Sequence, residues 1–167
     1  MFVSHYGRSS MKCSALVIAL AIALLSTACG SFGPLGPISG GHLRGDVHAG
    51  PVTDWAFAQE IETVQLETNP ESPHSVNTWI GIVEGHAYIP TSLILGPDDP
   101  REREWVANVV ADPRVRVRID GVVYELKVVR VEDASEREAA RTALLAEHAA
   151  ESDSHSSSAW IFRLEAR

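Results

Sequence analysis

The chain has 167 residues, enough for one domain and a leader, and its 45% hydrophobic and 22% charged residues are typical of a globular protein. Its 22 acidic residues outnumber the 14 basic ones, so the formal net charge is −8. A surface this acidic repels phosphates, which excludes nucleic-acid binding. Cys13 and Cys29 both precede the expected globular part, so no disulfide framework is expected there.

Residues 1–28 have the pattern of a signal peptide. Two basic residues precede an unbroken apolar run over residues 15–25, and small residues follow it. Eleven helical residues span only about 16 Å of a hydrocarbon layer about 30 Å thick, so this run is too short for a permanent membrane span. Both Met1 and Met11 are suitable start positions, and the sequence does not distinguish them.

Residues 25–30 (LSTACG) resemble the lipobox of bacterial lipoproteins, in which the cysteine is acylated and becomes the new N-terminus. The resemblance implies lipidation of Cys29, although Ser26 stands where Leu or Val is usual. A secretory signal cleaved after Ala28 is the alternative. The absence of Asp at Gly30 and Ser31 implies, by the same resemblance, anchoring in the outer membrane with the domain facing the periplasm.

Residues 29–50 are rich in glycine and contain two prolines. Such a composition cannot bury enough apolar surface to offset the entropy lost on ordering, so it predicts a flexible tether. The domain is expected to occupy residues 51–167.

The first part of this domain is expected to be β-structure. Residues 59–67 are strand-like, and residues 76–83 alternate in polarity. Glu84-Gly85 is a turn signal, after which residues 86–95 return as the second strand of a hairpin.

A short helix is expected next. Asp99 is a suitable cap and Pro100 a suitable first residue, and Pro113 ends the helix. Its apolar stripe is formed by four residues. These are Trp105, Val106, Val109 and Val110.

The remaining elements are a second hairpin, a helix and a last strand. Residues 114–119 (RVRVRI) predict a strand with valines inward, and Asp120-Gly121 turns the chain into a strand over 122–131. Ser135 to Glu138 is a capping box that opens a helix to about residue 149. A polar loop over 151–158 then leads to a strand over 160–165.

This order predicts a mainly β domain with two helices, an α+β antiparallel split β-barrel of about six strands. It resembles the split-barrel family that includes pyridoxamine-phosphate oxidases, flavin reductases and deazaflavin-dependent reductases. The resemblance covers residues 54–166. It rests on Asp54-Trp55, 66–68, 105–108, 111–115, the Asp120-Gly121 hairpin and 162–164.

The resemblance implies a flat cofactor, FMN or a deazaflavin, at the interface of a homodimer. In that family Arg, Lys, Ser or Thr near the second hairpin strand and the following helix hold the phosphate. The matching residues of this chain are Tyr88, Thr91 and Ser92 on the strand and Arg101 and Arg103 at the helix start. Two further cofactor-binding candidates are Trp105, which could stack on the flat ring, and Asn108, which could contact the ligand. Many flavin binders have Lys where this chain has Trp105, whereas deazaflavin-type members have Trp; this departure counts against ordinary FMN binding.

Each of these residues also has a purely structural interpretation. Trp105 lies on an apolar stripe and suits the core, and Asn108 suits a bond to a loop carbonyl. Thr91 and Ser92 suit cross-strand contacts in a sheet. The two arginines alternate with glutamates, as on a solvated helix face.

The chain offers no catalytic machinery of its own side chains. Its seven histidines are scattered without metal-ligand spacing, and no nucleophile motif or phosphate-binding loop is present, so no metal is expected. If the domain is an enzyme, a cofactor carries the chemistry. Two functions therefore remain open, a lipid-anchored cofactor-binding oxidoreductase and a non-catalytic envelope lipoprotein that uses the barrel as a binding or structural module.

Overall fold

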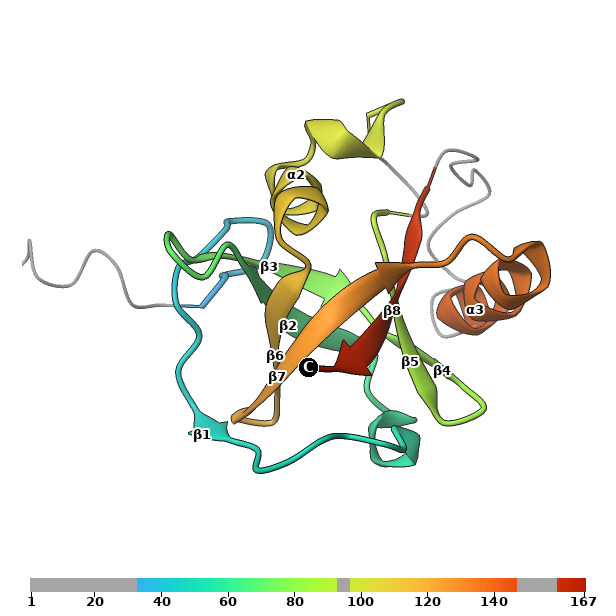
Figure 1. Ribbon diagram of the computed structural model, residues 1–167, viewed down its shortest axis with the longest axis horizontal. Coiled ribbons are helices and arrows are strands. Elements are labelled where there is room, and N and C mark those ends of the chain that lie inside the picture. Colours follow the sequence, from blue (N-terminus) through green and yellow to red (C-terminus); the bar gives the residue numbers. More distant parts are fainter. Residues whose placement is uncertain (1–32, 93–96, 147–158) are drawn as a thin grey trace, which may run out of the picture.

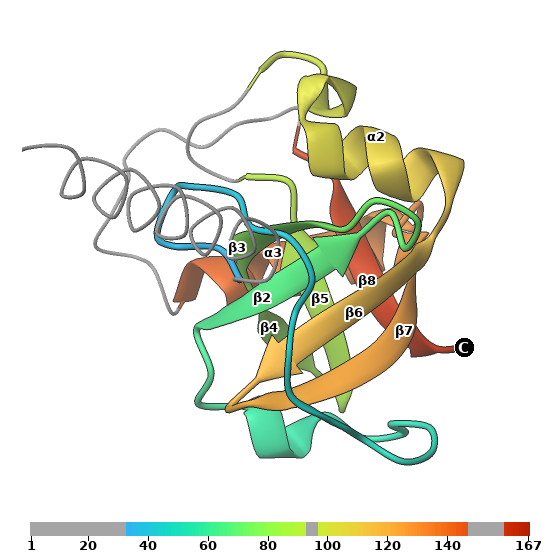
Figure 2. The same cartoon turned by 90° about the vertical axis from the view of Figure 1, so that its left-hand side faces the viewer.

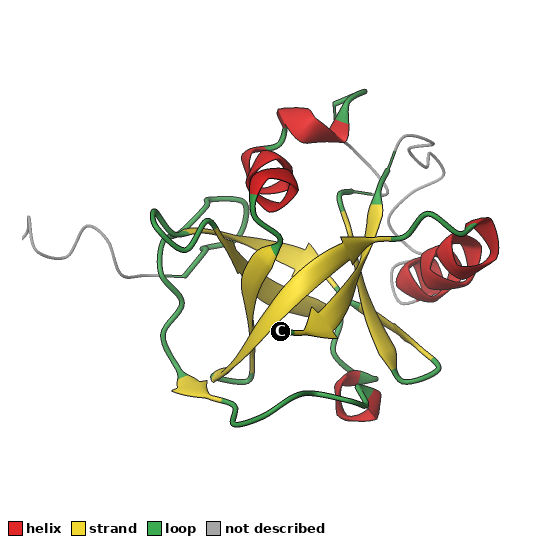
Figure 3. Cartoon of the chain, viewed as in Figure 1, coloured by secondary structure: helices red, strands yellow, loops and turns green. Residues whose placement is uncertain are grey.

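The computed structural model describes residues 33–92, 97–146 and 159–167. They form a strongly curled antiparallel sheet with two α-helices, which confirms the α+β split-barrel prediction (Figures 1 and 3). The predicted signal peptide and Cys29 lie outside the described residues. So do the end of the strand predicted over 86–95, the end of the last helix and the polar loop over 151–158.

The sheet has the strand order β3-β2-β6-β7-β8-β5-β4, and its neighbouring strands are antiparallel. A short additional strand, β1, pairs in parallel with the start of β7. The strands are β1 (Asp46–Val47), β2 (Thr63–Thr68), β3 (His74–Trp79), β4 (Gly81–Val83), β5 (His86–Pro90), β6 (Arg114–Ile119), β7 (Val122–Arg130) and β8 (Ile161–Ala166).

The two strands at the ends of this order, β3 and β4, are halves of one chain segment. Only Ile80 separates them, and β3 pairs with β2 while β4 pairs with β5. The single strand predicted over 76–83 is therefore divided, which gives seven strands along the sheet rather than about six. Because one continuous segment joins both ends of the sheet, the backbone itself brings the two edges of the barrel together.

Both predicted hairpin turns are confirmed. Glu84 and Gly85 have φ of 49° and 76°, and Asp120 and Gly121 have φ of 48° and 85°. Two successive positive φ angles define the type I′ turn, whose twist matches that of the flanking strands.

The main core fills the barrel with alternate side chains of its strands. Val64, Leu66, Val115, Val117 and Leu126 are among them, and each is at most 1% exposed. The inward position of the β6 valines follows the period of two in a strand and confirms the prediction.

Helix α2 (Glu104–Ala111) contributes Trp105, Val106 and Val109 to this core. Val110, which the stripe included, is instead 59% exposed. At about 100° per residue, Val110 lies about 40° beyond the arc that the three buried residues span, so the expectation for it is wrong.

Helix α3 (Ala134–Ala146) lies outside the barrel, where it packs on β4 and β5 (Figure 1). Its cap is Asp133, whose carboxylate accepts from the Glu136 N–H at 2.8 Å, rather than the predicted Ser135. Ser135 instead donates its hydroxyl to that carboxylate. The predicted capping box is wrong because the earlier acidic residue occupies the cap position.

Several residues of the segment that was expected to be a flexible tether contact the barrel. Leu43 is fully buried, and Gly40 and Ser75 exchange backbone hydrogen bonds of 2.8 Å. Leu43 also donates its N–H to the Glu67 carboxylate. The Arg116 guanidinium forms an ion pair with the same carboxylate at 3.0 Å. The segment runs along the outside of β2 and β6 (Figure 2), so specific contacts compensate for its glycine-rich composition.

Candidate functional site

A pocket of about 260 Å³ lies where β3 and β5 end beside the start of α2. Three of the seven predicted site residues, Thr91, Ser92 and Arg103, line it. The full lining is Asn77, Thr78, Trp79, Pro90, Thr91, Ser92 and Arg103. We take this pocket as the candidate site.

Pairing with the end of the chain holds Thr91 in place. Its N–H donates to the Trp160 carbonyl at 2.9 Å, and its hydroxyl oxygen accepts from the Trp160 N–H at 3.0 Å. These bonds continue the β5–β8 ladder by one residue beyond Pro90 and Ile161. Since a hydroxyl can donate while it accepts, Thr91 still has a proton to offer a ligand.

Arg103 reaches the pocket from the junction between the 3₁₀ helix η2 (Pro100–Glu102) and α2. Its extended backbone, with φ −78° and ψ 126°, breaks the helical path between the two elements. None of the described residues that line the pocket is acidic. A guanidinium beside hydroxyl and amide groups is suited to the oxygens of a phosphate or carboxylate.

Arg101, two residues earlier, does not line this pocket. Its guanidinium binds the Asp99 carboxylate through both Nε and Nη2, the latter at 2.7 Å. The hydrogen bonds from Arg101 hold the pKa of Asp99 below its ordinary value. Of the two arginines predicted at the helix start, only Arg103 therefore lines the candidate pocket.

Three other predicted residues are engaged inside the fold. Tyr88 lies under α3 and donates its hydroxyl to Glu136 at 3.0 Å, and burial raises the pKa of its phenol. Trp105 is 5% exposed and packs edge-on against Phe162. Asn108 donates to the Thr68 hydroxyl at 3.1 Å. Contact of these three residues with a cofactor stays a prediction.

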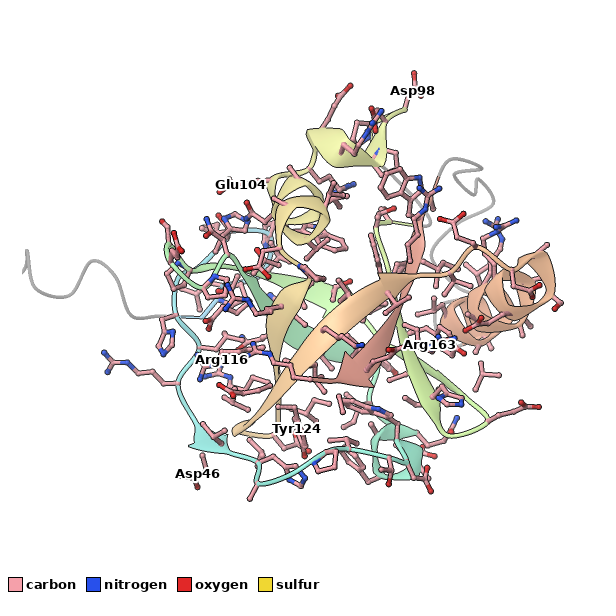
Figure 4. The ribbon with its side chains drawn as sticks, in the orientation of Figure 1. Asp46, Asp98, Glu104, Arg116, Tyr124 and Arg163 are labelled. Atoms are coloured by element: carbon pink, nitrogen blue, oxygen red, sulfur yellow. The ribbon has the colours of Figure 1, made fainter. Side chains whose placement is uncertain are left out.

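A second pocket of about 460 Å³ has Trp160, the hydrogen-bond partner of Thr91, in its lining. Arg130, Arg137, Asp98 and Asp99 also line this pocket. The Arg130 guanidinium lies 3.8 Å from the centroid of the Trp160 ring. Figure 4 shows Asp98 beyond the end of the barrel that α2 covers. The sequence does not indicate Trp160 or Arg130, because the pairing of β5 with β8 brings Trp160 to Thr91 and the pairing of β7 with β8 brings Arg130 to Trp160.

Residues 33–92, 97–146 and 159–167 contain neither a membrane-spanning helix nor a metal-binding cluster. No helix there is both long and apolar enough to cross a bilayer. Nor do those ranges hold a group of three or more His, Cys, Asp or Glu residues placed to bind a metal ion.

The curled sheet and its two helices define the class of fold, an α+β split barrel. Over residues 72–159 the chain matches the family described as F420H(2)-dependent quinone reductase. This match covers more than half of the chain and includes every residue that lines the candidate pocket. The chain belongs to this family.

One solved structure, with a TM-score of 0.50, agrees on the fold. A conserved hypothetical protein of Mycobacterium tuberculosis is 18% identical with a TM-score of 0.50, over 73% of this chain and 86% of that one. A putative pyridoxamine 5′-phosphate oxidase of Listeria innocua is 18% identical with a TM-score of 0.48, over 65% and 86% of the two chains. An F420-H2 dependent reductase, also 18% identical, has a TM-score of 0.45 over 63% and 95%. No curated protein matches the chain.

Family membership confirms the resemblance to split-barrel reductases and the expected class of cofactor, a flavin or deazaflavin.

Proposed function

We propose that this domain binds a deazaflavin of the F420 type and transfers its reducing equivalents to a flat acceptor such as a quinone. The family match supports the cofactor and the reaction. The observation that carries the proposal is the convergence of Arg103, Thr91 and Ser92 on one pocket within the matched residues.

The pocket fits the anionic part of such a cofactor. Arg103 would bind a phosphate or carboxylate oxygen, and the hydroxyls of Thr91 and Ser92 would donate to its neighbours. Trp105, which stands where many flavin binders have Lys, is buried against Phe162, so Arg103 supplies the positive charge in its place. A bound deazaflavin would supply hydride chemistry, and Arg103, Thr91 and Ser92 would hold and orient it.

The size of the pocket supports a homodimer. Pockets that enclose a cofactor usually measure about 300–1,000 Å³, and this one measures about 260 Å³. A flat ring system would therefore extend beyond it, and a second copy of the chain would cover the exposed face of the ring.

The proposal includes a lipid anchor at Cys29 that holds the domain on the periplasmic side of the outer membrane. The leader with its apolar run and the LSTACG segment support this location. We expect Cys29→Ser to release the protein into the soluble fraction. Retention of this variant in membranes prepared without detergent would contradict the lipid assignment.

The cofactor proposal is tested by titrating F420 with the purified protein and following the fluorescence of the deazaflavin. We expect saturable binding that Arg103→Ala weakens by about tenfold or more, since hydrogen bonds to charged groups contribute about 1.5–3 kcal/mol. Arg118→Ala is the control because Arg118 does not line this pocket. Absence of binding to the wild type would favour the non-catalytic envelope module instead.

A further inference from the structure

Two aliphatic side chains project into solvent from a tight turn at the start of the described chain. Leu35 and Ile38 exchange backbone hydrogen bonds of 3.0 Å, with Gly36 between them at a φ of 56°. Leu35 is 72% and Ile38 is 67% exposed, more than any other large hydrophobic residue that the structure describes. We call residues 35–38 the apolar turn.

The apolar turn is held rigidly against the barrel. The Asn77 side chain donates to the Gly36 carbonyl at 2.9 Å, and the Gln65 side chain donates to the Pro34 carbonyl at 3.4 Å. Further along, Gly40 is bonded to Ser75 and Leu43 is buried. Figure 2 shows this segment beside β2 and β3. Two aliphatic side chains are thus fixed side by side in an exposed position.

The apolar turn is also close in sequence to the predicted lipid. Only Gly30, Ser31 and Phe32 stand between Cys29 and Gly33. Four residue steps span at most about 14 Å even when fully extended. An acylated Cys29 would therefore keep Leu35 and Ile38 within reach of the bilayer surface.

We infer that the apolar turn inserts into the membrane interface and fixes the orientation of the domain on the bilayer. The inference rests on the proposed lipid anchor. Cleavage before Cys29 removes Arg8 and Lys12, which leaves 12 basic and 22 acidic residues and a net charge of −10. The chain therefore gains no net attraction to anionic lipid headgroups, so the contact is apolar. Its insertion is therefore expected to be insensitive to salt and to the fraction of anionic lipid.

This contact also places the candidate site relative to the membrane. Asn77 holds the apolar turn through Gly36 and at the same time lines the pocket that contains Arg103. The contacts of Pro34, Gly36, Gly40 and Leu43 with the barrel shorten the tether that the sequence predicts over residues 29–50. The pocket is then held near the bilayer instead of moving on a long spacer.

The test uses the full-length lipidated protein with a single environment-sensitive nitrobenzoxadiazole dye. Cys13 leaves with the leader and Cys29 is acylated, so an introduced cysteine is the only free thiol. Ile38→Cys carries the dye at the apolar turn. Val110→Cys is the matched control, because Val110 is a similarly exposed aliphatic residue, at 59%, on α2. Both proteins are reconstituted into vesicles of phosphatidylethanolamine and phosphatidylglycerol.

We expect the dye at residue 38 to shift its emission to the blue and to be quenched by lipids that carry a spin label on the acyl chain. The dye at residue 110 should show neither effect, and added salt should not change the result. If the protein floats with the vesicles while both dyes behave as in water, the docking is wrong and the anchor stands. If the protein does not float with the vesicles, both are wrong, whereas the F420 titration still tests the cofactor proposal separately.

Discussion

Glu67 is the one charged residue that is buried within the described ranges, at 3% exposure. Its carboxylate accepts from Arg116, also shown in Figure 4, and from the Leu43 N–H, and His42 lies 3.2 Å away. These contacts link β2, β6 and the N-terminal segment. A buried carboxylate is stable only when such partners compensate its lost hydration.

We expect Arg116→Ala to lower the free energy of unfolding by about 3 kcal/mol, because Glu67 would remain buried without its cationic partner. Arg118→Ala is the matched control on the same strand, since Arg118 donates to the Arg44 carbonyl from an exposed site. It should cost about 0.5 kcal/mol or less. Urea denaturation measures both values, and equal losses would contradict this role of Glu67.

Asp112 is expected to make the free energy of unfolding depend on pH in the acidic range. Hydrogen bonds from Arg114 lower its pKa from 3.8 to about 2 in the folded protein. Because the folded-state pKa lies below the unfolded one, the contribution is complete above the unfolded value and is lost as the pH falls toward about 2. The stability difference between wild type and Asp112→Asn should therefore shrink between about pH 5 and about pH 2. A difference that is constant across this range would contradict the assignment.

At the scale of the elements, the N-cap of α3 can be assigned to Asp133 or to Ser135 by mutation. We expect Asp133→Ala to destabilise the helix by about 1 kcal/mol, the usual cost of removing an N-cap side chain. Ser135→Ala should cost less, because Ser135 only supports the Asp133 carboxylate. Hydrogen exchange of the α3 amides measures both effects, and a larger effect of the serine variant would restore the capping-box interpretation.

The docking of the N-terminal segment depends on a close approach at Gly45. A Cβ at this position would lie 2.0 Å from the backbone carbonyl oxygen of Gly121. We expect Gly45→Ala to displace β1 from β7 and to expose residues 44–50 to proteases. Val47→Ala is the control, because Val47 is 55% exposed and its truncation leaves the backbone contact intact. Equal protease resistance of the two variants would contradict the docked arrangement.

Local chemistry explains which elements the sequence predicts well. Asp120-Gly121 and Glu84-Gly85 carry the residues that a turn with positive φ requires, so both hairpins follow from short motifs. No short motif predicts that the strand expected over residues 76–83 is divided at Ile80. This division depends on two partner strands, β2 and β5, from different parts of the chain. The same holds for Leu43, whose burial depends on contacts with distant β2 and β6.

At the scale of the whole molecule, the candidate site was predictable only in part. Thr91, Ser92 and Arg103 lie between the first hairpin and α2 in the sequence, so the resemblance to split-barrel reductases was enough to identify them. Only the fold shows that Arg101 forms an ion pair with Asp99 and that Arg103 lines the pocket. Trp160 is 69 residues from Thr91 in sequence, and no local pattern indicates their contact.

Oxidation of reduced F420 by a quinone in the presence of the purified full-length protein tests the central claim most directly. We predict that the protein accelerates this reaction, that Arg103→Ala lowers the rate at limiting cofactor, and that Arg118→Ala leaves it unchanged. A folded wild-type protein that oxidises reduced F420 no faster than quinone alone would contradict the proposed reductase function.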